Sequence, residues 1–133
     1  MTKRAAARIA YVNSLEKVDP FSPGYLAELL ALPEIATAQG YVLTYAPRHP
    51  NCHNTGHVPR HRLVMEAKIG RYLQPGETVH HLNGVRNDNR EANLELWQSA
   101  QKPGIRNADA INWASDILGR NRPAKLTATD LAM

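Results

Sequence analysis

The chain has 133 residues, of which 43% are hydrophobic and 21% are charged, and its formal net charge is +4 with neutral histidines. This composition is typical of one small globular domain with appended segments and argues against a disordered chain. The single cysteine excludes an intramolecular disulfide framework, and no apolar run approaches the ~20 residues of a membrane span. We therefore expect a cytoplasmic protein without a membrane partner, and the basic balance weakly favours a polyanionic one.

The N-terminal part of the chain predicts two helices. Residues 3 to 18 are rich in alanine and basic residues, and Tyr11 lies on the side expected to pack on the domain, although such a helix could instead lie on nucleic acid. Ser22 can cap a second, short helix, which Pro33 ends. We predict that residues 1–39 form a helical extension and that the main domain starts after them.

The next elements are predicted from their residue types and from the Pro, Asn and Gly residues that favour loops and helix ends. Residues 41 to 45 have the β-branched and aromatic content of a strand. The Pro-, Asn- and Gly-rich stretch from 47 to 56 predicts a loop, and His57 to Ile69 predicts a helix that Gly70 ends. Near the C-terminus, residues 107 to 118 predict an amphipathic helix.

The stretch from Glu77 to Trp97 contains the pattern that packing alone does not explain. Two adjacent histidines end an apolar run, and an Asn- and Gly-rich loop and a second apolar run follow, which predicts a β-hairpin. Neighbouring residues on a strand point to opposite faces, so His80 and His81 can have different roles although they lie only a few ångströms apart. One can bind a metal ion as a neutral imidazole while the other accepts a proton. Asn93 could tie the end of the loop to its beginning.

A family resemblance rests on three motifs in order, namely His61–Glu66, Pro75–Gly84 and Asp88–Trp97. Together they resemble the HNH homing-type endonucleases often found in phages, from about Gly40 to about Leu118. The resemblance implies an α+β fold with a small ββα-metal (His-Me finger) core, in which a hairpin packs on one helix around a single ion. Extra N-terminal helices and a C-terminal helix would surround a nuclease domain at residues 40–119, followed by a tail at 120–133.

The same resemblance implies roles for individual residues. His80 matches a metal ligand, and His81 matches the general base that activates water. Asn93 matches the middle Asn of the motif, which braces the loop and orients the base, and Asn89 resembles a second, structural Asn of that loop. The third motif position, usually His or Asn, has no histidine here.

Amide side chains near the third motif position could replace the missing histidine. Gln101, or Asn107 further on, could supply an amide oxygen, and oxygen ligands favour one Mg or Mn ion, with Zn or Ni as alternatives. A site completed by water and phosphate stays open as well. The expected activity is metal-dependent hydrolysis of DNA, as a nick or a double-strand cut.

DNA is the expected partner, bound mainly through its phosphate backbone, and a homodimer and a phage terminase are further candidates. Basic residues before the hairpin and around its loop are suited to bind phosphates: Arg60, Arg62, Lys68, Arg71, Arg86, Arg90 and Arg106. The alternative function is a catalytically weak or inactive HNH-fold accessory protein that binds DNA in phage packaging or recombination.

The sequence upstream of the hairpin contains candidate ligands for a competing metal site, namely His49, Cys52, His53, His57 and His61. Their spacing superficially imitates a zinc site, yet structural zinc sites usually contain at least two thiolates. Packing and surface roles are the preferred interpretation for these histidines. His61 belongs to a motif of the resemblance and is expected to pack near the active site.

Overall fold

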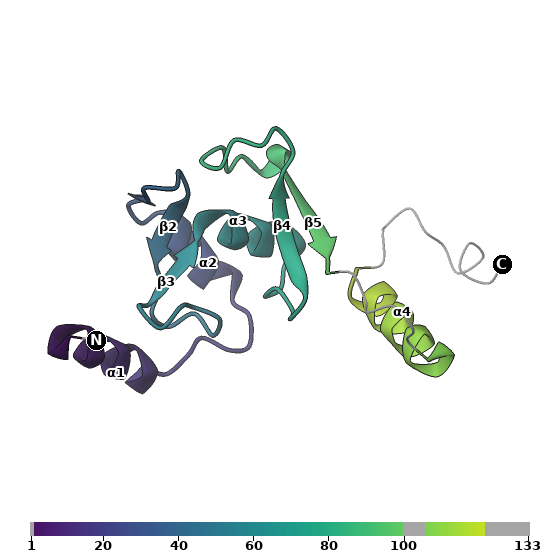
Figure 1. Ribbon diagram of the computed structural model, residues 1–133, viewed down its shortest axis with the longest axis horizontal. Helices are drawn as coiled ribbons and strands as arrows, with labels where there is room; N and C mark the ends of the chain where they lie inside the picture. The colour runs from purple at the N-terminus through teal and green to yellow at the C-terminus, as the bar shows by residue number, and fades with distance from the viewer. Residues whose placement is uncertain (1, 100–105, 122–133) are drawn as a thin grey trace. The chain divides into compact units, whose positions relative to one another are not determined.

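A computed structural model describes residues 2–99 and 106–121 of the chain, which divides into compact units at 1–99 and 100–133. The mixture of helices and antiparallel strands confirms the predicted α+β class (Figure 1). In the first unit the elements are α1 (Lys3–Ser14), α2 (Pro23–Leu30), β1 (Ile35–Ala36), β2 (Val42–Tyr45), β3 (His57–Pro59), α3 (Arg60–Ile69), β4 (Glu77–His81), a 3-10 turn (Glu91–Asn93) and β5 (Leu94–Gln98).

The strands of the first unit form two antiparallel sheets, one with the order β1-β2-β3 and one made of β4 and β5. Helix α3 contacts both sheets and lies between them (Figure 1). Leu63 on α3 is buried in a cluster with residues of α2 and β3, whereas Met65 is buried on the other side with Leu73 and Leu94 beneath the hairpin. Because residues two positions apart point to opposite sides of a helix, α3 can join the two cores.

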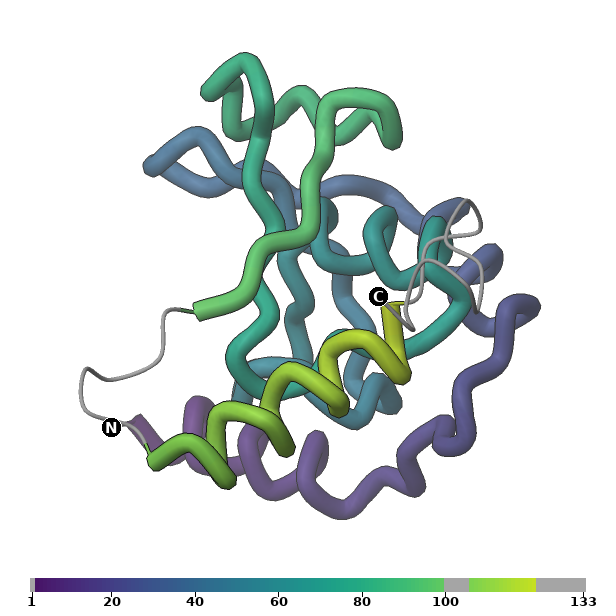
Figure 2. The backbone as a smooth tube through the Cα atoms, turned by 90° about the vertical axis from the view of Figure 1, so that its right-hand side faces the viewer, coloured from purple at the N-terminus to yellow at the C-terminus, as the bar shows by residue number. Residues whose placement is uncertain are grey.

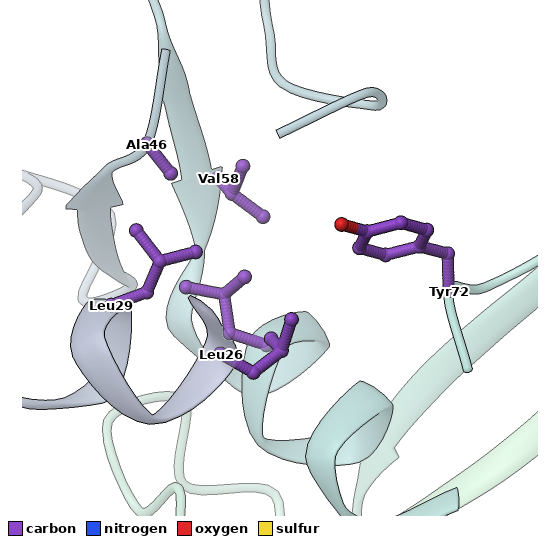
Figure 3. Packing of buried hydrophobic residues seen from close by; sticks show 6 residues of the cluster. Leu26, Leu29, Ala46, Val58 and Tyr72 are labelled. Atoms are coloured by element: carbon purple, nitrogen blue, oxygen red, sulfur yellow. The ribbon is translucent and has the colours of Figure 1, made fainter. Parts of the chain in front are cut away.

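The larger core lies between α2, α3 and the three-stranded sheet. Figure 3 shows Leu26 and Leu29 of α2 beside Val58 of β3, with the ring of Tyr72 pointing toward them. The start of α2 agrees with the sequence, since Ser22 Oγ accepts the backbone N–H of Tyr25 at 3.3 Å. This cap and the two buried leucines hold α2 on the sheet.

The helix predicted from His57 to Ile69 begins later than expected. His57 and Pro59 pair with Tyr45 and Leu43 as β3, and α3 starts only at Arg60. Residues 57–59 form a strand instead of an earlier turn of the helix because this pairing buries Val58 in the core. The predicted end is correct: Gly70 adopts a left-handed conformation with φ +75° and donates its N–H to the carbonyl of Glu66.

The N-terminal segment packs differently from the sequence prediction. In α1 the buried residue is Val12, while Tyr11 is 56% exposed. Lys17 continues the attachment, because its Nζ donates to the carbonyls of Val12 at 3.0 Å and Pro47 at 2.7 Å. The boundary predicted after residue 39 falls within the turn between the paired strands β1 and β2.

The second unit contains α4 (Asn107–Asn121) among its described residues. It continues past Gly119, where the sequence predicted its end, and an ion pair between Arg120 and Asp116 lies across its last turn. Ile111 and Leu118 of its apolar face are exposed. No helix in the described ranges is long and apolar enough to cross a membrane.

Candidate active site

The side chains of His80 and His81 lie on opposite faces of the hairpin formed by β4 and β5. His80 pairs with Glu95 and His81 with Leu94 in the antiparallel register. On the outer face the imidazole of His80 stacks on the indole of Trp97, with ring centres 3.8 Å apart and planes inclined by 16°. His81 lies on the face that packs against α3, as does the partly buried Val79. The two histidines therefore lie on opposite faces of the hairpin, as the alternation of a strand predicts. Figure 2 shows the two strands side by side below their long connecting loop.

The ring of His81 is held by the loop that follows it. Its Nε2 lies 2.8 Å from Oδ1 of Asn89. Because the amide oxygen is an acceptor, Nε2 carries the proton of the neutral ring and Nδ1 carries the lone pair. Asn89, expected only to support the loop, is thus the residue that orients His81.

Asn93 closes the loop as the sequence predicted. This side chain is 7% exposed, and its Oδ1 accepts the backbone N–H of Asn83 at 3.1 Å. Its Nδ2 donates to Oδ1 of Asn83 at 3.0 Å and to the carbonyl of Asp88 at 2.9 Å. One buried amide therefore joins the first residues of the loop to its middle, which fixes the position of Asn89 next to Asp88.

A second set of contacts stiffens the same loop at its surface. Asp88 accepts hydrogen bonds from the guanidinium of Arg90, both at 2.8 Å, and from Nδ2 of Asn83 at 2.8 Å. The hydrogen bonds from Arg90, and then the one from Asn83, hold the pKa of the Asp88 carboxyl well below its usual range. Asp88 thus stays ionised at all pH values relevant to a nuclease.

His61 packs beside His81, in agreement with the expectation that it lies near the candidate active site. It lies in the first turn of α3, and its ring centre is 5.0 Å from that of His81. Its Nδ1 is buried without a hydrogen-bond partner among the described residues. Burial, and then the neighbouring His81 and Arg62, lower the pKa of His61 to about 4. His61 is therefore neutral at neutral pH and adds no positive charge beside His81. The only sequence signal was its place in a family motif.

Donors suited to a metal ion lie on the outer face of the hairpin. The imidazole of His80 makes no hydrogen bond within residues 2–99 and 106–121, so its nitrogens are available to a ligand. Glu95 lies directly across the hairpin from His80 and accepts the indole N–H of Trp97 at 2.7 Å with one carboxylate oxygen. An imidazole with a neighbouring carboxylate fits a divalent transition ion. Gln101, predicted as a further ligand, lies outside the described residues.

The upstream zinc site is not formed. Across residues 2–99 and 106–121, no group of three His, Cys, Asp or Glu side chains is placed to hold a metal ion. His49 instead uses both ring nitrogens inside the protein: Nε2 lies 2.6 Å from Oε1 of Glu66, and Nδ1 accepts the backbone N–H of Asn51 at 3.0 Å. The packing interpretation is therefore correct for His49.

Two of the basic residues predicted to bind DNA are engaged within the protein. Arg60 donates to the carbonyls of Leu29 and Leu30 at the end of α2, and its side chain is 12% exposed. Arg71 forms a two-pronged ion pair with the buried Glu77, at 2.7 and 2.8 Å. These contacts satisfy the guanidinium groups and give both residues structural roles.

The other predicted basic residues are better placed for a polyanion. Arg90 is 78% exposed beside the loop, Lys68 is exposed on α3, and Arg62 is half-buried in its first turn. Arg86 extends across the turn between β1 and β2, where it donates to the carbonyl of Gln39 at 2.7 Å. Arg106 belongs to the second unit and pairs there with Asp109.

Comparison with known families places the hairpin and its loop within a recognised domain. Residues 58–102 match the family model described as HNH endonuclease, which confirms the resemblance seen in the sequence. The matched part starts in β3 and includes α3, both histidines of β4 and the asparagines of the loop. No curated protein and no solved structure matched the chain.

Proposed function

We propose that the protein, which carries an HNH endonuclease domain at residues 58–102, is a metal-dependent DNA endonuclease with His81 as its general base. The observation that carries this proposal is the contact between His81 and Asn89, because it leaves the unprotonated Nδ1 of the neutral ring for a water molecule. A positioned base of this kind contributes about 10²–10⁴-fold to a hydrolysis rate.

In the proposed reaction, Nδ1 of His81 takes a proton from water as the water oxygen attacks the phosphorus of a phosphodiester. The bond from phosphorus to the 3′ oxygen breaks and that oxygen takes up a proton from solvent, which leaves a 5′-phosphate and a 3′-hydroxyl, the outcome expected of the family. Asn89 keeps the ring in one tautomer and orientation throughout. Asn93 supports this step indirectly, since it holds the loop that carries Asn89.

His80 is the proposed metal ligand, with the carboxylate of Glu95 across the strand and Gln101 as proposed further donors. A divalent ion bound there would offset the negative charge that develops on the phosphate and its departing oxygen. Carboxylate and amide oxygens favour Mg or Mn, whereas the imidazole also suits Zn or Ni.

The proposed DNA contacts are the exposed Lys68, Arg86 and Arg90 and the half-buried Arg62. Arg106 of the second unit is a separate proposed contact. Their spacing around a nuclease domain suits phosphate binding more than base reading. Arg60 and Arg71 are left out, because their guanidinium groups stabilise α2 and β4.

The test is conversion of supercoiled plasmid to nicked and linear forms in buffers that contain Mg, Mn, Ni or Zn, each with a chelator control. Metal-dependent conversion by the wild-type protein supports the nuclease, and the ratio of nicked to linear product distinguishes cutting of one strand from cutting of both. Binding of the plasmid with no conversion in any metal would overturn the proposal and favour a non-catalytic DNA-binding module of the same fold.

A further inference from the structure

A pocket of about 340 Å³ opens beside the candidate base, between the β1–β2 turn and the start of α3. Its walls are largely apolar or aromatic and include Tyr41, Leu43, Pro59 and His61. None of these side chains carries a charge at neutral pH, since the pKa of His61 is lowered to about 4. Such a lining suits a flat, weakly polar group.

The pocket shares a wall with the proposed catalytic site. The ring of His61 lines the pocket and lies 5.0 Å, centre to centre, from the ring of His81. The ring of Tyr41 follows at 5.9 Å from His61. A group bound in the pocket is therefore separated from the ring of His81 by a single imidazole ring, that of His61.

Arg86 adds a positive charge at the edge of this pocket. Its guanidinium carbon lies 4.9 Å from the centre of the Tyr41 ring, and its Nη1 donates to the carbonyl of Gln39, another residue of the pocket lining. The contact joins the hairpin loop to the β1–β2 turn and keeps Tyr41 in place. An aromatic wall with an arginine beside it is the combination that stacks a nucleic-acid base and attracts the adjacent phosphate.

We infer that this pocket binds one base of the DNA strand being cut, taken out of the helix stack next to the scissile phosphate. The inference rests on the proposed nuclease function, and it adds a substrate preference. An enzyme that extrudes a base must expend the energy of unpairing, so DNA with a base already unpaired should bind more tightly. The protein should therefore favour bulged or unpaired sites over fully paired duplex.

The experiment measures binding of labelled duplexes to the His81→Ala protein, so that the strands stay intact. Three duplexes are compared: fully paired, with a one-nucleotide bulge, and with an abasic bulge that has the same backbone but no base. We expect the base-containing bulge to bind about tenfold more tightly than the other two, the factor typical of one base–aromatic stack. Equal binding of the abasic and base-containing bulges would overturn the inference.

Two substitutions identify the pocket as the source of the preference. Tyr41→Phe keeps the ring and should keep the preference, whereas Tyr41→Ala should reduce it to less than twofold. Tyr41 is 36% exposed, so its replacement leaves the buried cores intact, and circular dichroism checks the fold. A preference that persists in Tyr41→Ala would contradict the proposed pocket. Plasmid cutting without bulge preference refutes the pocket alone, whereas bulge preference without cutting refutes the nuclease alone.

Discussion

Oδ1 of Asn89 lies 2.8 Å from Nε2 of His81, across the loop that joins β4 to β5. The contact assigns the proton of the neutral imidazole to Nε2 and leaves the lone pair of Nδ1 for water. Asn89 does not need to touch substrate for this role. It acts as a positioning residue, and its effect should be visible in the pH dependence of the reaction.

Replacement of Asn89 by aspartate should shift the pH profile of cleavage. A carboxylate next to the ring stabilises the protonated imidazolium, so the ring should hold its proton up to a higher pH in this variant. Because the base works only when deprotonated, the acid limb of the rate profile should move to higher pH. Asn89→Ala should lower kcat about tenfold, without the upward shift. Single-turnover rates between pH 5 and 9 provide the measurement, and identical profiles for Asn89→Asp and wild type would refute the role of Asn89.

His61 should make the folded protein less stable in mild acid. Its pKa is lowered from 6.5 to about 4 by burial and by His81, so between these values the unfolded chain binds a proton that the folded protein does not. The free energy of unfolding should therefore fall as pH decreases from 6.5 to 4. The full shift would amount to ~3 kcal/mol, which solvent screening of the partly exposed ring reduces to about 1–2 kcal/mol.

Urea unfolding of wild type and His61→Gln at several pH values in this window tests the effect. The variant lacks the titrating ring, so its stability should depend less on pH than that of the wild type. His53→Gln is the matched control, because His53 is exposed and its removal should leave the wild-type slope unchanged. Equal slopes for wild type and His61→Gln would show that His61 titrates normally.

The pair formed by His49 and Glu66 should be a main source of stability. Both side chains are 1% exposed, and Nε2 of His49 lies 2.6 Å from Oε1 of Glu66, whose other oxygen accepts the backbone N–H of Leu73 at 2.8 Å. His49→Ala would leave a buried carboxylate with fewer partners, at a cost of about 3 kcal/mol. Chemical denaturation measures this, with His53→Ala expected to change stability by less than ~0.5 kcal/mol. A loss below 1 kcal/mol for His49→Ala would contradict the role assigned to this pair.

The basic residues should separate into two classes when each is replaced by alanine. Arg90→Ala should weaken DNA binding and lower the slope of log affinity against log salt by about one, because one phosphate contact is lost. Arg71→Ala should instead lower stability, since it removes the positive charge that pairs with the buried carboxylate of Glu77. Fluorescence anisotropy at several salt concentrations, together with thermal unfolding, tests both statements. The assignment fails if Arg71→Ala changes the salt slope while the stability of the fold is unaffected.

The sequence predicted the hairpin and its loop better than the packing around them. Asn-Gly between apolar runs, together with Asn93 before Leu94, was enough to predict the loop closure, because such contacts form between residues close in the chain. Because side chains alternate between the two faces of a strand, the sequence also predicted that His80 and His81 lie on opposite faces. The role of Asn89 as the direct partner of His81 was not predicted, because several asparagines of the loop had equivalent local patterns.

Structural features that depend on contacts between residues far apart in the chain were not predicted from the sequence. Leu63 is buried on one side of α3 and Met65 on the other, whereas Ala67 is exposed. A helix that lies between two sheets buries two of its faces. A search for one stripe of apolar residues along the helix does not detect this arrangement. The short strand β3 was hidden for the same reason, since its pairing with β2 spans a loop.

The most direct test of this account is the cleavage rate of His81→Ala beside wild type, with plasmid binding measured on the same samples. We predict that the variant binds DNA with nearly the wild-type affinity and unfolds at a similar temperature, while its rate in the best metal falls by at least ~10²-fold. A variant that cuts at the wild-type rate in metal-replete buffer would show that His81 is not the general base.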